Sequence, residues 1–338
     1  MTLYNEEETK KKIAALLPAV KDLKIERLPF SGNNRLYLLT AGKENFIAKH
    51  YFTHAKDPRN RLHAEYSFAS FAFQNGIACL PRPVARDDKN DLGIYSFLKG
   101  SKPRPQEIDQ NAVKAALDFL KELNRASCRA KADLPAASEA CFSIDDHLEL
   151  IEKRIKRLVP VKDPLAAGFI RERLAPAWET LRKEILARAK TAGIKTGEEL
   201  TPAEKIISPS DFGFHNALVG EEGRFYFLDF EYAGWDDPAK TAGDFFSQLA
   251  LPVPVENLGL FARETAALTP DPAKTLARIY LLLRLYRLKW CCIALNHFLP
   301  EDGERRKFSG EDMDRARQEQ LSKARKLLDS LNQLERKA

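Results

Sequence analysis

The stretch that decides the fold of this chain is SPSDFGFHNALVGEEGRFYFLDFEYAGWDDP, residues 208–238 of 338. Its middle predicts a β-hairpin, with strands over residues 217–219 and 225–228 joined by a turn over residues 220–224. The pairing of a hairpin runs outward from its turn, so residues just outside the two strands become neighbours. Polar side chains that flank this hairpin are therefore expected to meet.

Three polar residues lie in the right places. A turn centred on residues 222–223 places Asn216 opposite Asp229. Asp211 lies in the preceding loop, five residues before Asn216. Mg²⁺ suits such a group, because this small ion keeps waters and phosphate oxygens and takes only one or two ligands from the protein. We therefore expect Asn216 and Asp229 to be metal ligands beside a nucleotide.

Asp211 suits a different role. Phosphoryl transfer needs positioning, neutralisation of phosphate charge by metal, and a carboxylate that accepts the proton of the attacking hydroxyl. We expect Asp211 to be that catalytic base. The simpler interpretation is that Asp211, Asn216 and Asp229 only form turns, for which Asp and Asn are favoured. Their joint occurrence at this spacing argues against it.

These residues resemble the catalytic segment of the aminoglycoside phosphotransferase and choline kinase family, small-molecule kinases that share the protein-kinase-like fold. In that family an aspartate is followed after four residues by an asparagine, and another aspartate comes after the next hairpin, as do Asp211, Asn216 and Asp229. The similarity continues through Glu231, Gly234 and Asp237-Pro238. It implies an α+β, two-lobed fold with a small strand-rich N-lobe and a larger helical C-lobe, and it implies ATP and Mg²⁺ as cofactors.

Residues 211–213 also spell Asp-Phe-Gly, the metal-binding motif of protein kinases. Position argues against that role here, because a metal aspartate of that type follows a strand and comes after the metal asparagine. Asp229, in FYFLDFE, meets both conditions, and Asp211 meets neither.

Two positions depart from the family pattern. The family commonly has a histidine two residues before the catalytic aspartate, where this chain has Pro209. Proline lacks an N–H, so we expect the loop to hold its shape through other contacts. An aspartate that braces the catalytic loop is replaced by Thr241, and we expect Asp244, about one helical turn away, as its substitute.

The first hundred residues predict the nucleotide-binding lobe. Strands are expected over residues 23–30, 35–40, 45–51 and 93–98, and a helix over residues 58–74. Composition changes near residue 100, so we place the N-lobe at residues 1–100 and the C-lobe at residues 101–338, with ATP in the cleft between them. C-lobe helices are expected over residues 108–126, 144–159, 164–192, 272–298 and 311–334, and Pro176 is expected to begin a new helix or kink the third one.

Several N-lobe residues are candidate nucleotide ligands. The turn Ser31, Gly32, Asn33 and Asn34 is expected to fold backbone N–H groups over phosphates, although it lacks the GxGxxG pattern. Lys49, in FIAKHY, is placed to reach the α- and β-phosphates, and Glu65 on the following helix is expected to pair with it. Alone, each would be an ordinary surface residue. The resemblance also implies that the backbone of Ser96, Phe97 and Leu98 hydrogen-bonds adenine.

Composition sets the outer bounds of this interpretation. A chain of 338 residues with 44% hydrophobic residues can fill two cores, and we expect a soluble globular protein. Five cysteines without CxxC spacing indicate a reducing compartment and argue against zinc and redox roles. The charged N-terminus lacks the apolar core of a signal peptide, so we expect a cytoplasmic location. The apolar stretch 279–299 contains three cations and predicts a buried helix, with no membrane partner.

The net charge of +6 does not indicate a particular binding partner. Basic residues gather over 153–157, 305–307 and 323–326, mixed with acidic residues and without an aromatic platform, so we expect solvated helix faces and no nucleic acid. A nucleic-acid-binding protein remains a minor alternative, marked by salt-dependent affinity. A catalytically weak nucleotide-binding regulatory protein of the same fold is the main alternative, although it need not keep Asp211, Asn216 and Asp229 together.

Together these patterns predict an ATP- and Mg²⁺-dependent phosphotransferase that acts on a hydroxyl of a small molecule, such as an amino sugar, a choline-like compound or another alcohol. Glu231, Trp235 and Asp236 are expected to line the acceptor pocket as an acidic rim suited to an amino or quaternary ammonium group. The chain has no segment resembling an APE-type activation loop, which argues against protein substrates. The residues name no particular acceptor and no oligomeric state.

Overall fold

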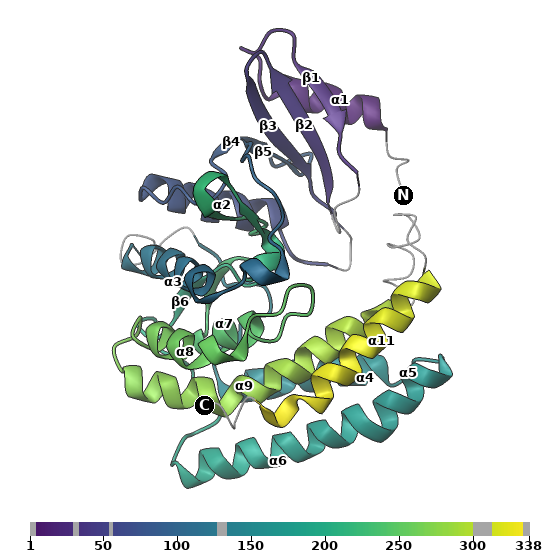
Figure 1. Ribbon diagram of the computed structural model, residues 1–338, viewed down its shortest axis with the longest axis vertical. Coiled ribbons are helices and arrows are strands. Elements are labelled where there is room, and N and C mark those ends of the chain that lie inside the picture. The colour runs from purple at the N-terminus through teal and green to yellow at the C-terminus, as the bar shows by residue number, and fades with distance from the viewer. Residues whose placement is uncertain (1–4, 30–33, 54–56, 127–133, 300–312, 334–338) are drawn as a thin grey trace.

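Apolar alternation in the first hundred residues builds a sheet, and helical periodicity dominates the rest of the chain. The structure, a computed structural model, describes residues 5–29, 34–53, 57–126, 134–299 and 313–333. Figure 1 shows the strand-rich N-lobe at the top and the larger helical C-lobe below it. The predicted α+β, two-lobed architecture is confirmed.

The N-lobe contains a five-stranded antiparallel sheet. Its strands are β1 (Lys24–Arg27), β2 (Arg35–Ala41), β3 (Glu44–His50), β4 (Pro83–Asp87) and β5 (Leu92–Ser96), in the spatial order β1-β2-β3-β5-β4. Alternate residues of β2 and β3, among them Tyr37 and Phe46, point to one face and are buried against Ile13 of helix α1 (Glu6–Ala15). This small core holds β3, and with it Lys49, in a fixed place.

Two N-lobe elements are absent from the sequence prediction. Strand β4 begins at Pro83 and lies at the edge of the sheet, where a missing N–H is tolerated. Pro81 and Pro83 are typical of a loop, which hides the strand in the sequence. Helix α1 is mostly charged and has only Thr9 and Ile13 buried, which leaves almost no apolar periodicity to detect. Its N-cap is Asn5, whose side chain accepts a hydrogen bond from the Glu8 N–H.

The C-lobe is formed mainly by helices. They are α3 (Gln110–Arg125), α4 (Ile144–Leu158), α5 (Pro164–Phe169), α6 (Ala175–Thr191), α7 (Pro238–Phe245), α8 (Leu258–Ala266), α9 (Pro272–Leu295) and α11 (Met313–Asp329). The helix predicted over 164–192 is divided by a π-helical turn at Ile170–Leu174, and Pro176 lies in the first turn of α6. Helix α9 packs against α4, α7 and α11 and is buried on most sides. Within the described ranges, no helix is long and apolar enough to cross a membrane.

Helix α2 (Arg61–Gln74) connects the two lobes. It contacts β4 and β5 of the sheet, while its Phe68 ring stacks on Phe230 of the C-lobe with centroids 4.5 Å apart. Phe68 also meets Phe119 of α3 edge-on at 6.4 Å. Since α2 is packed against both lobes, Glu65 in its middle has a defined position relative to each of them.

The predicted hairpin consists of β7 (Ala217–Val219) and β8 (Phe225–Phe227), but the predicted register is wrong by one residue. Ala217 pairs with Phe227, and the Leu228 N–H donates to the Asn216 carbonyl at 2.8 Å, so Asn216 lies opposite Leu228. The cause is the turn, which has three residues, Glu221–Gly223, in place of two. Two of these residues have positive φ, 61° and 76°, and the Gly220 N–H closes the loop on the Arg224 carbonyl.

Strand β9 (Gly234–Asp236) pairs with β6 (Ile206–Ser208) and also lies against residues 135–137. A Cβ at Gly234 would lie 2.2 Å from the Pro135 carbonyl oxygen and 2.7 Å from the Ala137 nitrogen, so the backbones would have to separate. We expect Gly234→Ala to destabilise the fold by about 1–3 kcal/mol in urea unfolding.

The matched control is Gly168→Ala, in α5, where a Cβ would meet nothing within 4 Å. This change is expected to leave stability unchanged or raise it by roughly 0.5–1 kcal/mol, because alanine favours a helix. Equal effects of the two substitutions would show that the close approach at Gly234 is unimportant.

Candidate active site

Lys49 is a cation shared by two carboxylates from different parts of the fold. Its Nζ lies 2.7 and 3.0 Å from the two oxygens of Glu65 on α2 and 2.9 Å from Asp229 Oδ1, just after β8. The Lys49 side chain is only 12% exposed, whereas that of Asp229 is 40% exposed. Burial lowers the pKa of the Lys49 amine, but Asp229 and Glu65 outweigh this effect and hold the pKa above its ordinary value. Lys49 is therefore charged.

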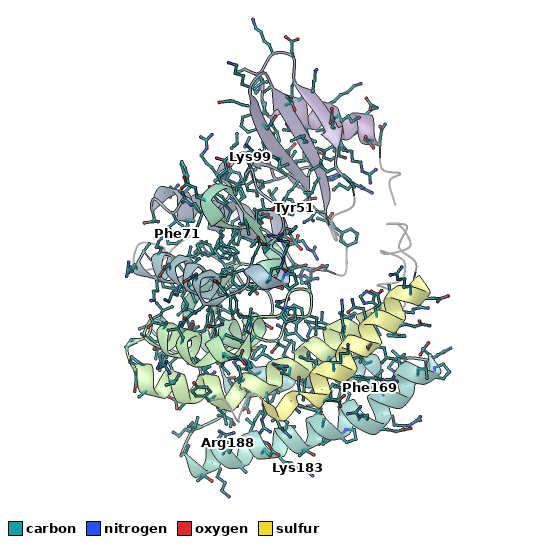
Figure 2. The ribbon with its side chains drawn as sticks, viewed as in Figure 1. Tyr51, Phe71, Lys99, Phe169, Lys183 and Arg188 are labelled. Carbon is teal, nitrogen blue, oxygen red and sulfur yellow. The ribbon has the colours of Figure 1, made fainter. Side chains whose placement is uncertain are left out.

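Two tyrosines complete the surroundings of Glu65. Tyr51 Oη donates to Glu65 Oε2 at 2.7 Å and lies 2.9 Å from the Tyr95 hydroxyl. Figure 2 shows Tyr51 where the sheet meets the helical lobe. The sequence patterns above point to neither Tyr51 nor Tyr95. A signal exists for Tyr51, because it follows Lys49 by two residues and so belongs to the same face of an extended chain.

Asp211 and Asn216 lie together, as the sequence predicts. Asn216 Nδ2 donates to the Asp211 carbonyl at 3.0 Å and approaches Asp211 Oδ2 at 3.3 Å. Because the carboxamide presents its nitrogen to Asp211, its oxygen faces elsewhere and is available to a cation. The opposite carboxylate oxygen, Asp211 Oδ1, lies 3.2 Å from His215 Nε2. His215 is a site residue to which no sequence pattern above points.

Asp211 is ionised at neutral pH. Burial raises the pKa of the Asp211 carboxyl, but the His215 hydrogen bond and the nearby charge of Lys289 contribute to a net pKa below the ordinary value. A carboxylate of this kind is charged and half-buried, with donors on both oxygens. It can accept a proton from a bound hydroxyl through a remaining lone pair.

Among the described side chains, Asp229 makes no hydrogen bond to Asn216 or Asp211. Lys102 binds the backbone of the loop that carries Asp211 and is also affected by the charge of Asp229. Lys102 Nζ donates to the His215 carbonyl at 2.8 Å, and the charge of Asp229 opposes the effect of burial, which lowers the pKa of Lys102. No cluster of three or more His, Cys, Asp or Glu residues suited to a metal occurs in the described chain. A cation held by Asn216 and Asp229 would thus take most of its ligands from water and phosphate, as Mg²⁺ does.

The expected phosphate-binding turn is only partly described, because Ser31, Gly32 and Asn33 lie outside the described residues. Asn34 is described and buried. Its Nδ2 donates to Glu231 Oε2 at 2.7 Å, and its Oδ1 accepts from the Phe52 N–H at 3.3 Å. The Asn34 side chain therefore binds protein groups at both of its ends.

Two of the three backbone N–H groups in the segment between the lobes already have partners. The Ser96 N–H donates to the Arg82 carbonyl at 2.8 Å, and the Phe97 N–H donates to the Asn45 carbonyl at 3.3 Å. No partner for the Leu98 N–H occurs among residues that the structure describes. Backbone binding of adenine by Ser96, Phe97 and Leu98 stays a prediction, and Leu98 is the residue of the three whose N–H can serve it.

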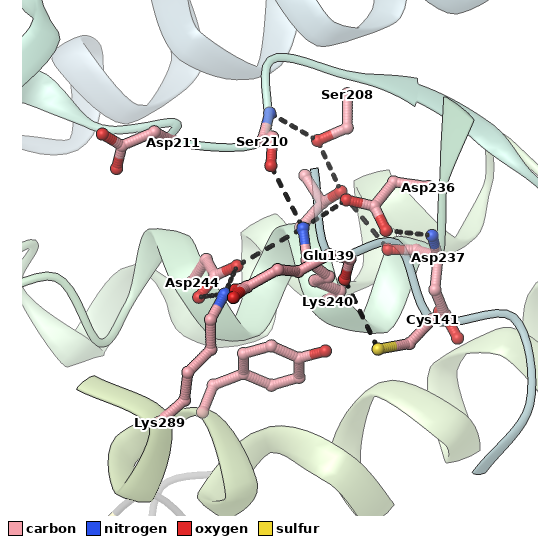
Figure 3. Close-up of polar contacts among 12 residues, drawn as sticks. Glu139, Cys141, Ser208, Ser210, Asp211, Asp236, Asp237, Lys240, Asp244 and Lys289 are labelled. Atoms are coloured by element: carbon pink, nitrogen blue, oxygen red, sulfur yellow. Dashed lines mark hydrogen bonds and ion pairs between the residues drawn. The ribbon is translucent and has the colours of Figure 1, made fainter. Parts of the chain in front are cut away.

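The loop before Asp211 is braced by α7. Ser208 Oγ accepts from the Ser210 N–H at 3.0 Å and from the Thr241 hydroxyl at 2.9 Å, and Lys240 Nζ donates to Ser210 Oγ at 3.2 Å (Figure 3). Ser210 has a φ of 64°, unusual for a residue with a side chain. Thr241 itself thus binds the loop where the family has an aspartate.

Asp244, the expected substitute, has other partners. It accepts from Lys289 Nζ at 2.8 and 3.0 Å and from Trp290 Nε1 at 2.8 Å, and Lys240 Nζ lies 3.7 Å away. The brace expected from Asp244 is indirect, because its side chain turns toward α9. Among the described contacts, Asp244 reaches Ser210 of the loop through Lys240.

The residues expected to form an acidic rim do not present free charges. Asp236 is fully buried, and Lys240 Nζ donates to its Oδ2 at 2.5 Å. Burial raises the pKa of Asp236 to about 6 even in the presence of Lys240. Glu231 is buried as well, bound to Asn34 and 3.7 Å from Arg61. Trp235 lies in β9, paired with Ile207.

We expect Lys240→Met to destabilise the protein by about 3–5 kcal/mol in urea unfolding, because it leaves Asp236 buried without its cation. The loss in free energy of unfolding relative to the unaltered protein should become smaller as the pH falls from about 8 to about 6. Without Lys240, the pKa of Asp236 rises further above its unfolded value, so the folded state gains protons and stability as the pH decreases.

The control is Lys274→Met, which removes a pair with Glu204 in which the lysine side chain is 57% exposed. Its expected loss is about 0–1 kcal/mol. A loss at Lys240 no larger than at Lys274, or one independent of pH, would mean that the buried pair does not stabilise the loop.

Comparison with known proteins agrees with the fold. A search of curated proteins found no match. Among solved structures, Plasmodium vivax ethanolamine kinase is 14% identical, with 99% of this chain and 91% of that chain covered and a TM-score of 0.59. The choline kinase of Streptococcus pneumoniae is 15% identical, with 96% and 99% covered and a TM-score of 0.56. An amicoumacin kinase in complex with AMP-PNP, Ca²⁺ and Ami is 16% identical, with 95% and 94% covered and a TM-score of 0.59.

At these identities, the structural likenesses describe the fold alone. The family match is made by the sequence itself. Residues 24–277 match the model of the APH family, described as the phosphotransferase enzyme family, and this range contains every candidate site residue named above. The chain belongs to the phosphotransferase enzyme family.

Proposed function

We propose that this protein transfers the γ-phosphoryl group of Mg²⁺-bound ATP to a hydroxyl group of a small molecule. The observation that carries the proposal is the position of Lys49, bound at once to Glu65 and to Asp229, in a chain whose Asp211 and Asn216 are in contact. Phosphoryl transfer requires a lysine that a helix glutamate holds in place, an aspartate that can bind the metal, and a carboxylate that can act as the base.

The nucleotide would lie between the lobes. The Leu98 N–H is the donor left for adenine, and Lys49 would bind the phosphates. Asn216 and Asp229 would hold Mg²⁺, since a carboxamide oxygen and a carboxylate are hard oxygen ligands. When bound, the ion neutralises charge on the β- and γ-phosphates.

Nucleotide binding would exchange partners at Asp229. In the structure Lys49 compensates the charge of this carboxylate at 2.9 Å. A cation arriving with the nucleotide can take over that compensation, and Lys49 can then turn toward the phosphates while Glu65 keeps it in place. Because each charge keeps a partner, the exchange avoids an isolated buried ion.

Asp211 would bind the acceptor hydroxyl and take its proton during attack. The similar solved structures named above are described as kinases of ethanolamine, choline and amicoumacin, so the acceptor is proposed as a small-molecule alcohol. A cationic acceptor is not required by the described residues, because Glu231 and Asp236 are already paired.

The test is ADP release from ATP across a panel of amino sugars, amino alcohols and other alcohols, with magnesium present or withheld. Asp211→Asn is expected to lower kcat by roughly 10²–10⁴-fold with little change in the KM for ATP. Asp118→Asn, an exposed aspartate on α3, is the control and should retain full turnover. Full turnover in Asp211→Asn would rule out the base, and ATP binding without turnover on any alcohol would favour a regulatory protein.

Substitutions of Asp229 and Lys49 should distinguish the residue that binds the metal from the residue that binds the nucleotide. Asp229→Asn is expected to raise the Mg²⁺ concentration for half-maximal rate by roughly 10–100-fold, the equivalent of one interaction with a charged group. Lys49→Met should instead raise the KM for ATP by a similar factor at saturating Mg²⁺. The same Mg²⁺ dependence in Asp229→Asn as in the unaltered protein would remove Asp229 from the metal site.

A further inference from the structure

We propose that His215 is a positioning residue for the catalytic base, holding the Asp211 carboxylate from the side of α9. The inference rests on the proposed function, because the base role of Asp211 belongs to it. His215 plays no part in the sequence pattern that identifies the site, and it is a residue of this chain whose ring directly contacts the proposed base.

The contact fixes the orientation of the carboxylate. His215 Nε2 lies 3.2 Å from Asp211 Oδ1, and Asn216 Nδ2 lies 3.3 Å from Oδ2, so each oxygen has its own donor. A carboxylate held at both oxygens cannot rotate freely about its bond to Cβ. The lone pair directed at the acceptor hydroxyl is then set before the substrate arrives.

The environment of the ring selects one tautomer. Nδ1 is buried and has no hydrogen-bond partner among the residues that the structure describes. Nε2 faces a carboxylate, which can only accept. A neutral ring therefore carries its proton on Nε2, where it donates to Asp211. The His215 backbone is fixed as well, since its carbonyl accepts from Lys102 Nζ.

The ring is seated between a glycine and an indole. A Cβ at Gly213 would lie 2.8 Å from His215 Nδ1 and 3.0 Å from Cε1, so any larger residue there would displace the ring. On α9, Trp290 meets the ring edge-on, with centroids 6.4 Å apart and planes at 83°. Trp290 Nε1 donates to Asp244 at 2.8 Å, which holds the indole in turn.

These contacts connect to a second set that holds the backbone before Asp211. From Asp244 the contacts continue to Lys240 at 3.7 Å and from Lys240 to Ser210, the residue immediately before Asp211 (Figure 3). Asp211 points away from Lys240 in this view. Lys240 thus holds the backbone just before Asp211, and His215 holds the Asp211 carboxylate. Asp244 contacts Lys240 directly and His215 through Trp290. Mere packing of His215 would not require its ring nitrogen to face the carboxylate.

The first test does not depend on turnover. In protein labelled with ¹⁵N-histidine, the ring signals of His215 are identified by their loss in His215→Gln. In the neutral form of the ring they should show the Nε2–H tautomer, and Asp211→Asn should shift the tautomer balance because the acceptor-only carboxylate is gone. An Nδ1–H tautomer, or ring signals unchanged by Asp211→Asn, would overturn the contact.

The second test measures its catalytic consequence, as ADP release with water as acceptor and with each active alcohol of the panel. His215→Phe is expected to lower kcat by roughly 10–100-fold, while the KM for ATP stays within about twofold. His215→Gln keeps a side-chain N–H and should recover part of the loss. Gly213→Ala keeps the histidine but displaces its ring, so it should act in the same direction. His63→Gln, on α2, is the control.

Rescue by the conservative variant separates positioning from packing. The KM for ATP does not depend on how much of a variant is folded, and His215→Gln restores a side-chain N–H but not the shape of the ring. An unchanged kcat in His215→Phe, or a loss that His215→Gln does not lessen, would overturn the proposal, whereas an inactive unaltered protein would refute the proposed function itself.

Discussion

One buried positive charge, that of Lys49, connects the parts of this molecule that must act together. Its strand belongs to the N-lobe sheet, Glu65 belongs to α2, and Asp229 follows the C-lobe hairpin. Removing charges from water is unfavourable by several kcal/mol for each ion, so such a group is tolerated only where every member has partners. Tyr51 supplies the additional donor to Glu65. The relative position of the lobes is thus coupled to the place where phosphates and metal are proposed to bind.

A second constraint acts on the loop that carries Asp211. Pro209 cannot supply the N–H or the side-chain donor that a histidine would offer, and Thr241 stands where a carboxylate is expected. In the structure, α7 holds the serines on both sides of Pro209. The Thr241 hydroxyl donates to Ser208, and the buried Lys240 reaches Ser210. Hydroxyl groups and a lysine therefore brace this loop.

The successes and failures of the sequence interpretation follow from the range of the interactions involved. Lys49 and Glu65 were predictable, because strand and helix periodicities orient them before any long-range contact is known. Asn216 and Asp211 were also predictable, being five residues apart in one loop. The hairpin register was not, because it depends on a three-residue turn with two positive φ angles that no residue in GEEGR uniquely demands. The acidic rim failed for a similar reason: whether Asp236 is free or neutralised depends on where Lys240 lies in space.

The sequence alone determined the two-lobed architecture, the family and the identity of the candidate base, metal ligands and phosphate-binding lysine, because these rest on residue types at short, regular spacing. Only the tertiary structure decided which charges are shared. It brought Asp229 to Lys49 across 180 residues, left the Leu98 N–H without a partner among the described residues, and placed His215 beside Asp211 and Trp290 beside His215. The physical reason is that hydrogen bonds and ion pairs act over a few ångströms, and chain folding alone sets which distant groups come that close.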